Sequence, residues 1–150
     1  MFLNGTAMSG QKDYNSHTGS NFLGQVRSSA SYRFFVIRDE FPGLYPVSQN
    51  GRSILGELYE MSDRILSESL LPAEPKELKL GQIELEDGRS VSAMILQTDR
   101  LASGDKVVDI SEIGSFRIYQ AFLRDNSNIK VLLGRSDIEA LADQRPLNLL

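Results

Sequence analysis

The segment that indicates the fold most directly is Phe2-Leu3-Asn4-Gly5-Thr6-Ala7-Met8-Ser9-Gly10, a short apolar lead followed by a turn of small residues. Asn and Gly tolerate positive φ, and a glycine lets another group approach the backbone closely. Such a turn can aim several main-chain N–H groups at one point, which suits a carboxylate or a developing oxyanion. The simpler alternative is a tight turn after the first strand, and the residues alone leave both interpretations open.

Composition limits the classes of function. The 150 residues are 41% hydrophobic and 24% charged, as in ordinary globular proteins. A net charge of −4 without a Lys/Arg cluster argues against nucleic-acid binding. The chain has no cysteine and one histidine, His17, which excludes disulfides, thiol catalysis and a histidine-rich metal cluster. We expect a cytoplasmic protein with no membrane span, and no metal or organic cofactor is implied.

Strand-like segments outnumber helix-like segments. Aromatic and β-branched residues predict strands at residues 22–26, 32–38 and 53–61. Two prolines and a Pro-Gly pair predict that residues 39–46 leave regular structure. Ser62 or Asp63 is then expected to cap a short helix that stops at Pro72.

The clearest local signal is a hairpin over residues 78–96. An Asp87-Gly88 turn separates two alternating apolar runs, a pattern typical of two antiparallel strands. The apolar residues before and after Gly81 fall on opposite phases of the outgoing strand. This phase change predicts a β-bulge at Gly81.

Three further elements are expected after the hairpin: a helix capped by Asp109 or Ser111, a strand at residues 129–133, and a terminal helix opened by Ser136 or Asp137. The connections are too short for repeated βαβ crossovers. The expected architecture is therefore α+β, a small, highly twisted mixed β-sheet or barrel with two or three packed helices. No repeat divides residues 1–150, so we expect a single domain.

The charged and aromatic residues of the predicted strands have expected orientations. Arg33 and Glu57 are expected to point outward, although either could face a pocket. The core is expected to contain Tyr32, Phe34, Tyr59, Phe116 and Tyr119.

The order of several motifs resembles the gamma-glutamylcyclotransferase-like family. The opening turn is similar to that family's Tyr-Gly-Thr/Ser-Leu-Met turn, with Asn4 at the tyrosine position. The resemblance is closest to one branch, the C-terminal domain of allophanate hydrolase. Its motifs are similar to Leu71-Pro72-Ala73-Glu74-Pro75, Leu80-Gly81-Gln82-Ile83-Glu84-Leu85-Glu86-Asp87-Gly88-Arg89 and Gly114-Ser115-Phe116-Arg117-Ile118-Tyr119. It covers residues 2–122 and leaves 123–150 as a C-terminal extension.

This resemblance implies a pocket over the Gly-Thr turn of a small β-barrel. Cyclotransferases of this type use a glutamate as general acid/base, and a straight count from Gly56 places it on Ala73, one residue before Glu74. We take Glu74 as the candidate catalytic residue; the alternative is a solvated loop glutamate. In the allophanate hydrolase branch a histidine lies at the position of Ala7. His17, in the following loop, could approach the pocket or be merely exposed.

The expected substrate-binding residues are Asn4, Gly5, Thr6, Ala7, Met8, Phe41, Pro42 and His17, with Glu74 as the catalytic group. The expected ligand is a small carboxylate or carbamate. Gamma-glutamyl cyclotransfer itself is not expected, because the family's catalytic positions are changed here. The alternative function is a non-catalytic accessory partner of an amidase-type enzyme, with the C-terminal extension as a possible docking surface.

Overall fold

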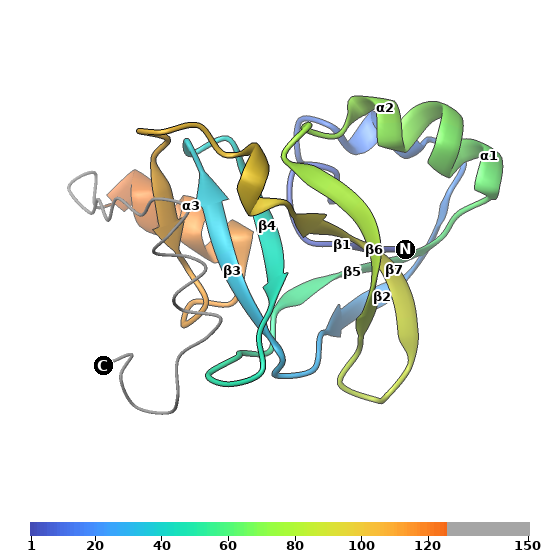
Figure 1. Cartoon of the computed structure of the whole chain (residues 1–150). Coiled ribbons are helices and arrows are strands. Elements are labelled where there is room, and N and C mark those ends of the chain that lie inside the picture. Colours follow the sequence, from blue (N-terminus) through green and yellow to red (C-terminus); the bar gives the residue numbers. More distant parts are fainter. Residues whose placement is uncertain (126–150) are drawn as a thin grey trace.

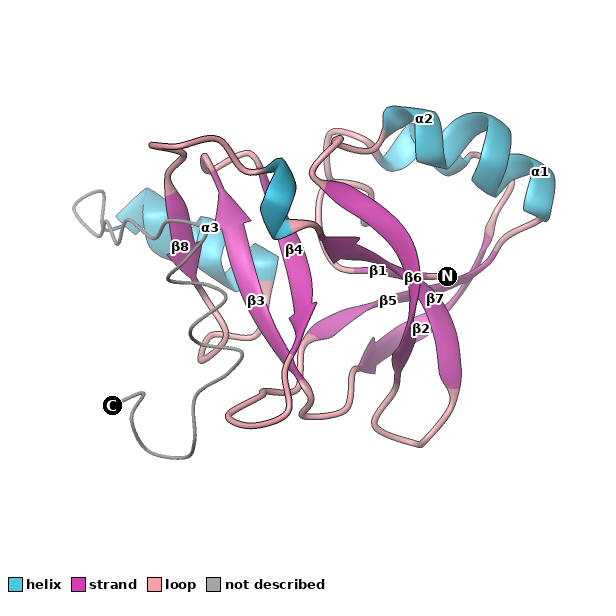
Figure 2. Cartoon of the chain, in the orientation of Figure 1, coloured by secondary structure: helices cyan, strands magenta, loops and turns pink. Residues whose placement is uncertain are grey.

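The computed structural model describes residues 1–125, so the strand and terminal helix expected after residue 125 lie outside the described residues. Within the described part, eight strands form one curled mixed sheet, a half-barrel (Figure 1). Two helical segments pack against it, one over an end of the half-barrel and one on its other side (Figure 2). The expected α+β class is confirmed.

The strands follow the order β2-β5-β1-β7-β4-β3-β8 across the sheet, with β6 paired to β7 outside this path. The β1–β7 and β4–β7 pairs are parallel and the other pairs are antiparallel. An isolated bridge between Ser28 and Leu85 brings the end of β2 to the β6–β7 hairpin and curls the sheet. The strand bounds are β1 Phe2–Leu3, β2 Asn21–Arg27, β3 Tyr32–Ile37, β4 Phe41–Pro46, β5 Leu55–Glu60, β6 Leu78–Glu84, β7 Ser90–Leu96 and β8 Val107–Asp109.

The prediction that residues 39–46 leave regular structure was wrong, because β4 contains both prolines. The amide of Val47 donates to Ser31 at 3.0 Å, so alternate residues of β4 turn their amides toward β3. Pro42 and Pro46 occupy the other phase, where a missing N–H costs no bond to β3.

The β6–β7 hairpin is confirmed, but the bulge at Gly81 is not. The pairing runs without interruption from Leu78 opposite Leu96 to Glu84 opposite Ser90. Gly81 instead makes room for a neighbour, because a Cβ there would lie 2.8 Å from Ile95 Cγ1. A register shift does occur in β2, between Phe22 and Gly24.

The first helical segment begins where the sequence predicts and continues past its expected end. Ser62 caps α1 (Asp63–Ile65), its side chain accepting from the Ile65 amide at 3.1 Å. A π-helical turn over Leu66–Leu70 leads into α2 (Leu71–Ala73), and the Leu71 amide donates to Leu66. Pro72 therefore lies within the last turn; the wider π turn before it accommodates the ring.

The second helical segment is α3 (Phe116–Asp125), which begins later in the sequence than expected. Asp109 is the last residue of β8, a strand not predicted from the sequence, and it accepts a hydrogen bond from the amide of Ser111 at 2.9 Å. Ser115 precedes the helix and accepts from the Ile118 amide at 3.3 Å. The cap is thus Ser115 rather than Asp109 or Ser111.

The core lies on both sides of β3, whose six residues are all buried. Phe34 and Val36 belong to the larger apolar cluster inside the half-barrel, while Phe35 and Ile37 belong to a smaller cluster on the opposite face. The aromatic residues expected in the core are all buried there: Tyr32, Phe34, Tyr59, Phe116 and Tyr119. No helix among residues 1–125 has the length and apolar character needed to span a membrane.

Candidate functional site

The opening turn follows β1 from the middle of the sheet. The Met8 amide donates to Gly5 at 3.1 Å and the Asp13 amide donates to Thr6 at 2.8 Å, which fold the segment back on itself. A Cβ on residue 5 would lie 2.6 Å from Pro42 Cδ, so glycine is required here for close approach to β4. The turn is thereby fixed against the start of β4.

A small cavity of about 20 Å³ lies beneath this turn. Its volume is sufficient for one water-sized group. Three parts of the predicted site line this cavity together: the opening turn, the Phe41-Pro42 pair and Glu74. The full lining is Phe2, Leu3, Asn4, Gly5, Thr6, Ala7, Phe41, Pro42, Glu74, Leu78 and Met94.

A larger open cleft of about 550 Å³ shares Thr6, Phe41 and Glu74 with the cavity. Its charged lining is mostly acidic, with five carboxylates against two cations. An acidic cleft attracts ligand groups that donate hydrogen bonds or carry positive charge. The charged residues are Asp13, Asp39, Glu40, Glu74 and Glu77, with Lys12 and Arg38.

Glu74 is the residue common to both spaces that can carry a proton. It follows the last helical residue of α2 with extended backbone (φ −78°, ψ 149°), which turns the chain toward the opening segment. No donor among residues 1–125 bonds its carboxylate. Burial and, secondarily, the charge of Asp13 raise the pKa of Glu74 to about 7. Such a group is present in both protonation states near neutral pH, as an acid/base group requires.

The turn between β3 and β4 forms another wall of the cleft. Arg38 and Asp39 have positive φ (52° and 58°), and the Glu40 amide closes the turn onto Ile37 at 2.8 Å. Two consecutive non-glycine residues in this conformation cost stability, and such strain is often found at functional sites. The Arg38 guanidinium binds buried Glu77 at 2.9 Å and lies 5.6 Å from the Phe41 ring.

Glu57 was expected to point outward and is buried instead. Its carboxylate accepts four hydrogen bonds: from the Ser9 amide (2.8 Å), the Ser9 hydroxyl (2.9 Å), the Tyr59 hydroxyl (2.9 Å) and Arg117 (3.1 Å). Burial raises the pKa of Glu57, but the bonds from Ser9, Tyr59 and Arg117 outweigh it and hold this pKa below its usual range. The signal was available, since residues 57 and 59 share one face of a strand and Tyr59 was expected in the core.

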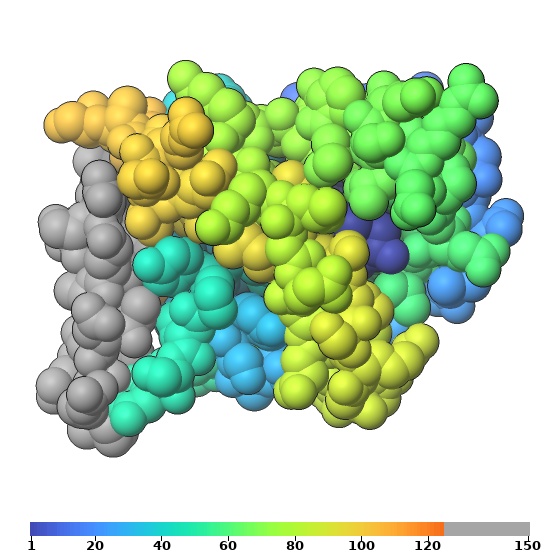
Figure 3. Space-filling model, turned by 45° about the vertical axis from the view of Figure 1, so that its right-hand side comes forward, coloured from blue at the N-terminus to red at the C-terminus, as the bar shows by residue number. Residues whose placement is uncertain are grey.

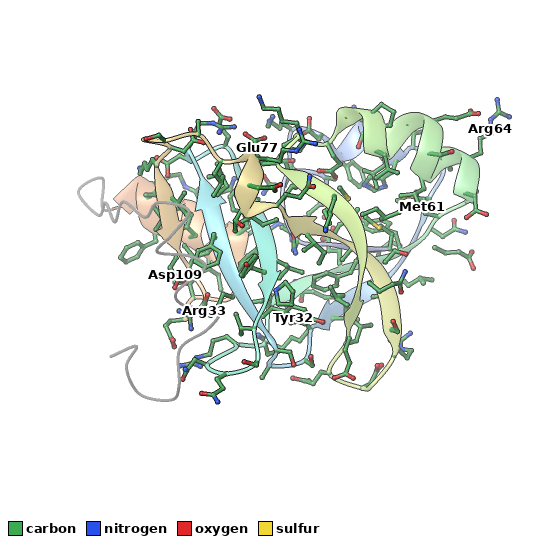
Figure 4. The ribbon with its side chains drawn as sticks, viewed as in Figure 1. Tyr32, Arg33, Met61, Arg64, Glu77 and Asp109 are labelled. Carbon is green, nitrogen blue, oxygen red and sulfur yellow. The ribbon has the colours of Figure 1, made fainter. Side chains whose placement is uncertain are left out.

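Arg33 was also expected to face solvent and is buried instead. Its guanidinium pairs with Asp109 at 2.5 Å and donates to the Asn50 carbonyl at 2.8 Å. Figure 4 shows Arg33 and Asp109 close together, away from Glu77, so this pair lies apart from the cleft. The ion pair joins β3 to β8 and holds the edge of the sheet.

Two of the predicted binding residues, Met8 and His17, line neither the cavity nor the cleft. Met8 belongs to the larger core cluster. His17 is 2% exposed, and its Nε2 lies 2.7 Å from the Ala7 carbonyl. Its ring packs edge-on against Tyr14 and Tyr59. His17 thus contacts the turn at the Ala7 carbonyl and lines neither the cavity nor the cleft.

The space-filling view shows how little of the opening segment reaches this face of the molecule. Only a small dark-blue area of it is visible, between the α1–α2 segment (green) and the β6–β7 hairpin (yellow-green) (Figure 3). Among residues 1–125, no three His, Cys, Asp or Glu side chains are grouped so as to hold a metal ion.

Comparison with known proteins confirms the resemblance inferred from the motifs. The family model described as the allophanate hydrolase C-terminal domain matches residues 1–121. A crystal structure of a uropathogenic E. coli-specific protein is 30% identical, with a TM-score of 0.71, and the match covers 80% of this chain and 93% of that chain. A comparison with curated proteins returns no match.

Two more distant structures share the fold. Kluyveromyces lactis allophanate hydrolase is 22% identical with a TM-score of 0.72; the match covers 81% of this chain and 21% of that one. An uncharacterised Pyrococcus horikoshii protein is 15% identical with a TM-score of 0.64, and the match covers 84% of this chain and 96% of that one.

Proposed function

From the membership of this chain in the allophanate hydrolase C-terminal domain family, we propose that its cleft binds a small carboxylate, carbamate or amide. We further propose that Glu74 transfers a proton to or from this ligand. Three features of the site support this proposal. The turn can hold a ligand oxygen that accepts hydrogen bonds, the acidic cleft can hold a ligand N–H group that donates them, and the carboxyl group of Glu74 lies between the two.

The turn supports binding of a carbonyl or carboxylate oxygen. The amides of Gly5, Thr6 and Ala7 donate to no acceptor within residues 1–125, and all three residues line the cavity. A buried amide without a partner is costly until an acceptor arrives. One ligand oxygen fits the volume of the cavity and would supply that acceptor.

The cleft supports the opposite end of the ligand. Asp13 offers carboxylate oxygens on one wall of the cleft, and Arg38 is already engaged by buried Glu77. A ligand N–H or ammonium group finds acceptors there, whereas a second carboxylate would meet like charge. The preferred ligands therefore combine one acidic or carbonyl end with at least one N–H group.

The observation that carries the proposal is the position of Glu74, which lines both spaces and has a pKa of about 7. In its protonated form it can donate to the nitrogen of a bound amide or carbamate, and in its ionised form it can take a proton from an attacking group. The family's histidine position is Ala7 here, so we assign the proton transfer to Glu74 and propose no gamma-glutamyl cyclotransfer.

The binding test uses NMR titration of the full chain with oxamate, which carries a carboxylate and an amide, followed by small carbamates and gamma-glutamyl compounds. We expect the amide signals of Gly5, Thr6 and Ala7 to shift. A panel that leaves these three signals unchanged would contradict the proposed site.

The catalytic test substitutes Glu74 by Gln. For any compound in the panel that the wild type converts, we expect a rate loss on the order of a hundredfold, with affinity changed only a few-fold. Glu68→Gln is the matched control, because Glu68 lies on the same helical segment, is exposed, and has Arg64 as its only ion-pair partner among residues 1–125. Equal rates in Glu74→Gln and wild type would remove the proposed role.

The second candidate is a non-catalytic accessory partner of an amidase-type enzyme. Its support is that the match covers only 21% of the K. lactis allophanate hydrolase chain, which therefore contains other parts. Exposed apolar side chains suited to contact with a partner include Phe22, Leu23 and Ile118. Co-purification that yields only the free monomer would count against this candidate.

A further inference from the structure

Helix α3 bonds to the opening segment and to the walls of the cleft through three polar side chains. Arg117 reaches the opening turn: its Nη2 donates to the Ser9 carbonyl, to the Ser9 hydroxyl at 3.0 Å and to Glu57 at 3.1 Å. Arg117 therefore ties α3 to the end of the segment whose beginning lines the cavity.

The next contact joins α3 to the opposite wall. The Tyr119 hydroxyl donates to Asp39 Oδ1 at 3.0 Å, and Tyr119 is only 2% exposed. Lys106 binds the other oxygen of Asp39. Asp39 is one of the two residues of the β3–β4 turn held at positive φ, so this bond fixes a backbone conformation that is uncommon outside glycine.

The third contact returns to the first wall, one residue further along α3. Gln120 and Gln11 exchange two hydrogen bonds through their side-chain amides, at 2.9 and 3.2 Å. Both residues line the cleft. Residues 119 and 120 thus bond to opposite walls of the same space.

In the part of the chain that the structure describes, the two walls have no polar contact of their own. Within residues 1–125, no hydrogen bond or ion pair joins residues 9–13 directly to the Arg38–Glu40 turn. The polar connection between them runs through α3. A rigid element bonded to both walls determines how far apart they lie.

We propose that α3 is the clamp that sets the width of the cleft, with Arg117, Tyr119 and Gln120 as positioning residues. The inference rests on the proposed function in one respect, since it concerns ligand affinity in that same cleft. Its geometric part, two walls held by one helix, stands independently of any ligand.

The test measures amide hydrogen exchange by NMR in the full chain, first without ligand. Tyr119→Phe should raise exchange at Arg38 and Glu40, whose amides bond Lys106 and Ile37, by about tenfold and leave Gln11 and Asp13 unchanged. Gln120→Met keeps the side-chain volume and removes the side-chain amide. It should raise exchange at Gln11 and Asp13 and leave Arg38 and Glu40 unchanged. Arg124→Gln is the control, an exposed position on α3 that lines neither space.

Exchange that rises equally throughout the molecule, or that stays unchanged at both walls, would overturn the clamp. A double-mutant cycle of Gln11→Met and Gln120→Met adds a second criterion. The two substitutions should be strongly non-additive at Asp13 if the pair is the link, and additive if it is not.

Binding then separates this inference from the proposed function. If oxamate binds wild type, the Tyr119→Phe/Gln120→Met double variant should bind it about tenfold more weakly, and Arg124→Gln should bind it normally. Unchanged affinity in the double variant overturns the clamp and leaves the proposed function intact. If neither oxamate nor any other panel compound binds wild type, the proposed function fails, and the exchange measurements still decide whether α3 holds the walls.

Discussion

Glu57 and Glu74 are two acidic side chains withdrawn from solvent on either side of the opening turn, and their surroundings are opposite. Glu57 accepts four hydrogen bonds, which hold its pKa below the usual range despite burial. Glu74 accepts none from the described residues, and burial with the nearby charge of Asp13 raises its pKa to about 7. The surroundings of Glu57 favour its charged form, and those of Glu74 bring its pKa close to neutral pH.

The difference separates an anchor from a reactive group. A carboxylate with all its acceptor sites filled holds other groups in place and has little left to offer a ligand. A carboxyl group that accepts no hydrogen bond from its surroundings and has a raised pKa is typical of reactive sites. The opening turn lies between them, fixed at Ser9 by Glu57 and facing Glu74 across the cavity.

The largest effect is expected when the anchor is removed. Glu57→Ala leaves the Tyr59 hydroxyl, the Ser9 amide and Arg117 without their shared acceptor, and should lower the free energy of unfolding by about 2–4 kcal/mol. Urea denaturation measures this loss. Glu60→Ala, an exposed position on the same strand, should cost no more than about 0.5 kcal/mol. Equal losses in the two variants would contradict the role assigned to Glu57.

The opposite sign is expected for Glu74→Gln. The folded pKa of about 7 exceeds the ordinary 4.5, so the folded state binds more protons than the unfolded state between these values. The stability that protonation of Glu74 contributes is therefore fully present below pH 4.5 and is lost as pH rises through 7. The variant lacks this loss and should be more stable than wild type at pH 8 by about 1–3 kcal/mol, with little difference at pH 4. Parallel pH profiles in urea would refute the raised pKa.

A smaller effect tests whether the two acids are independent. Tyr59→Phe removes one of the four donors to Glu57 while keeping the ring that packs on His17. We expect a loss of about 1 kcal/mol and a rise in the pKa of Glu57, with the pH profile attributed to Glu74 unchanged. A change in that profile would mean that the two sites are coupled through the turn.

The smallest effect concerns the second cause of the Glu74 shift. Asp13→Asn removes a like charge, so the pKa of Glu74 should fall below about 7 and remain above its ordinary value, because burial is the larger cause. A carboxyl carbon-13 NMR titration measures both limits. A fall all the way to the ordinary value would show that Asp13, rather than burial, dominates.

Sequence rules succeeded where the deciding neighbours are close along the chain. The Asp87-Gly88 turn fixed the β6–β7 hairpin, and Ser62 capped α1 as expected. They failed where distant residues decide. Pro42 is compatible with β4 because its nitrogen, which carries no hydrogen, faces away from β3. Glu57 is buried because Ser9 and Arg117 come to it from other parts of the chain.

The site was partly predictable, and for a different reason. No local pattern connects the opening turn with Phe41-Pro42 and Glu74; the resemblance did, and these segments do line one cavity. Their role in binding stays a prediction. Arg38, Asp39 and α3 were missed as parts of the cleft, because their positions depend on a strained turn and on side-chain bonds that sequence spacing does not encode.

The position of β1 has a consequence for how the protein acquires its site. This strand of two residues is synthesised before both of its partner strands, because Phe2 pairs with Leu58 on one side and with Ala93 on the other. Contacts between such distant parts of a chain close late and slow folding. The opening turn, which directly follows β1, therefore reaches its final place only after the β6–β7 hairpin has been synthesised, and a chain cut short before Ala93 would have most of the site residues but no cavity.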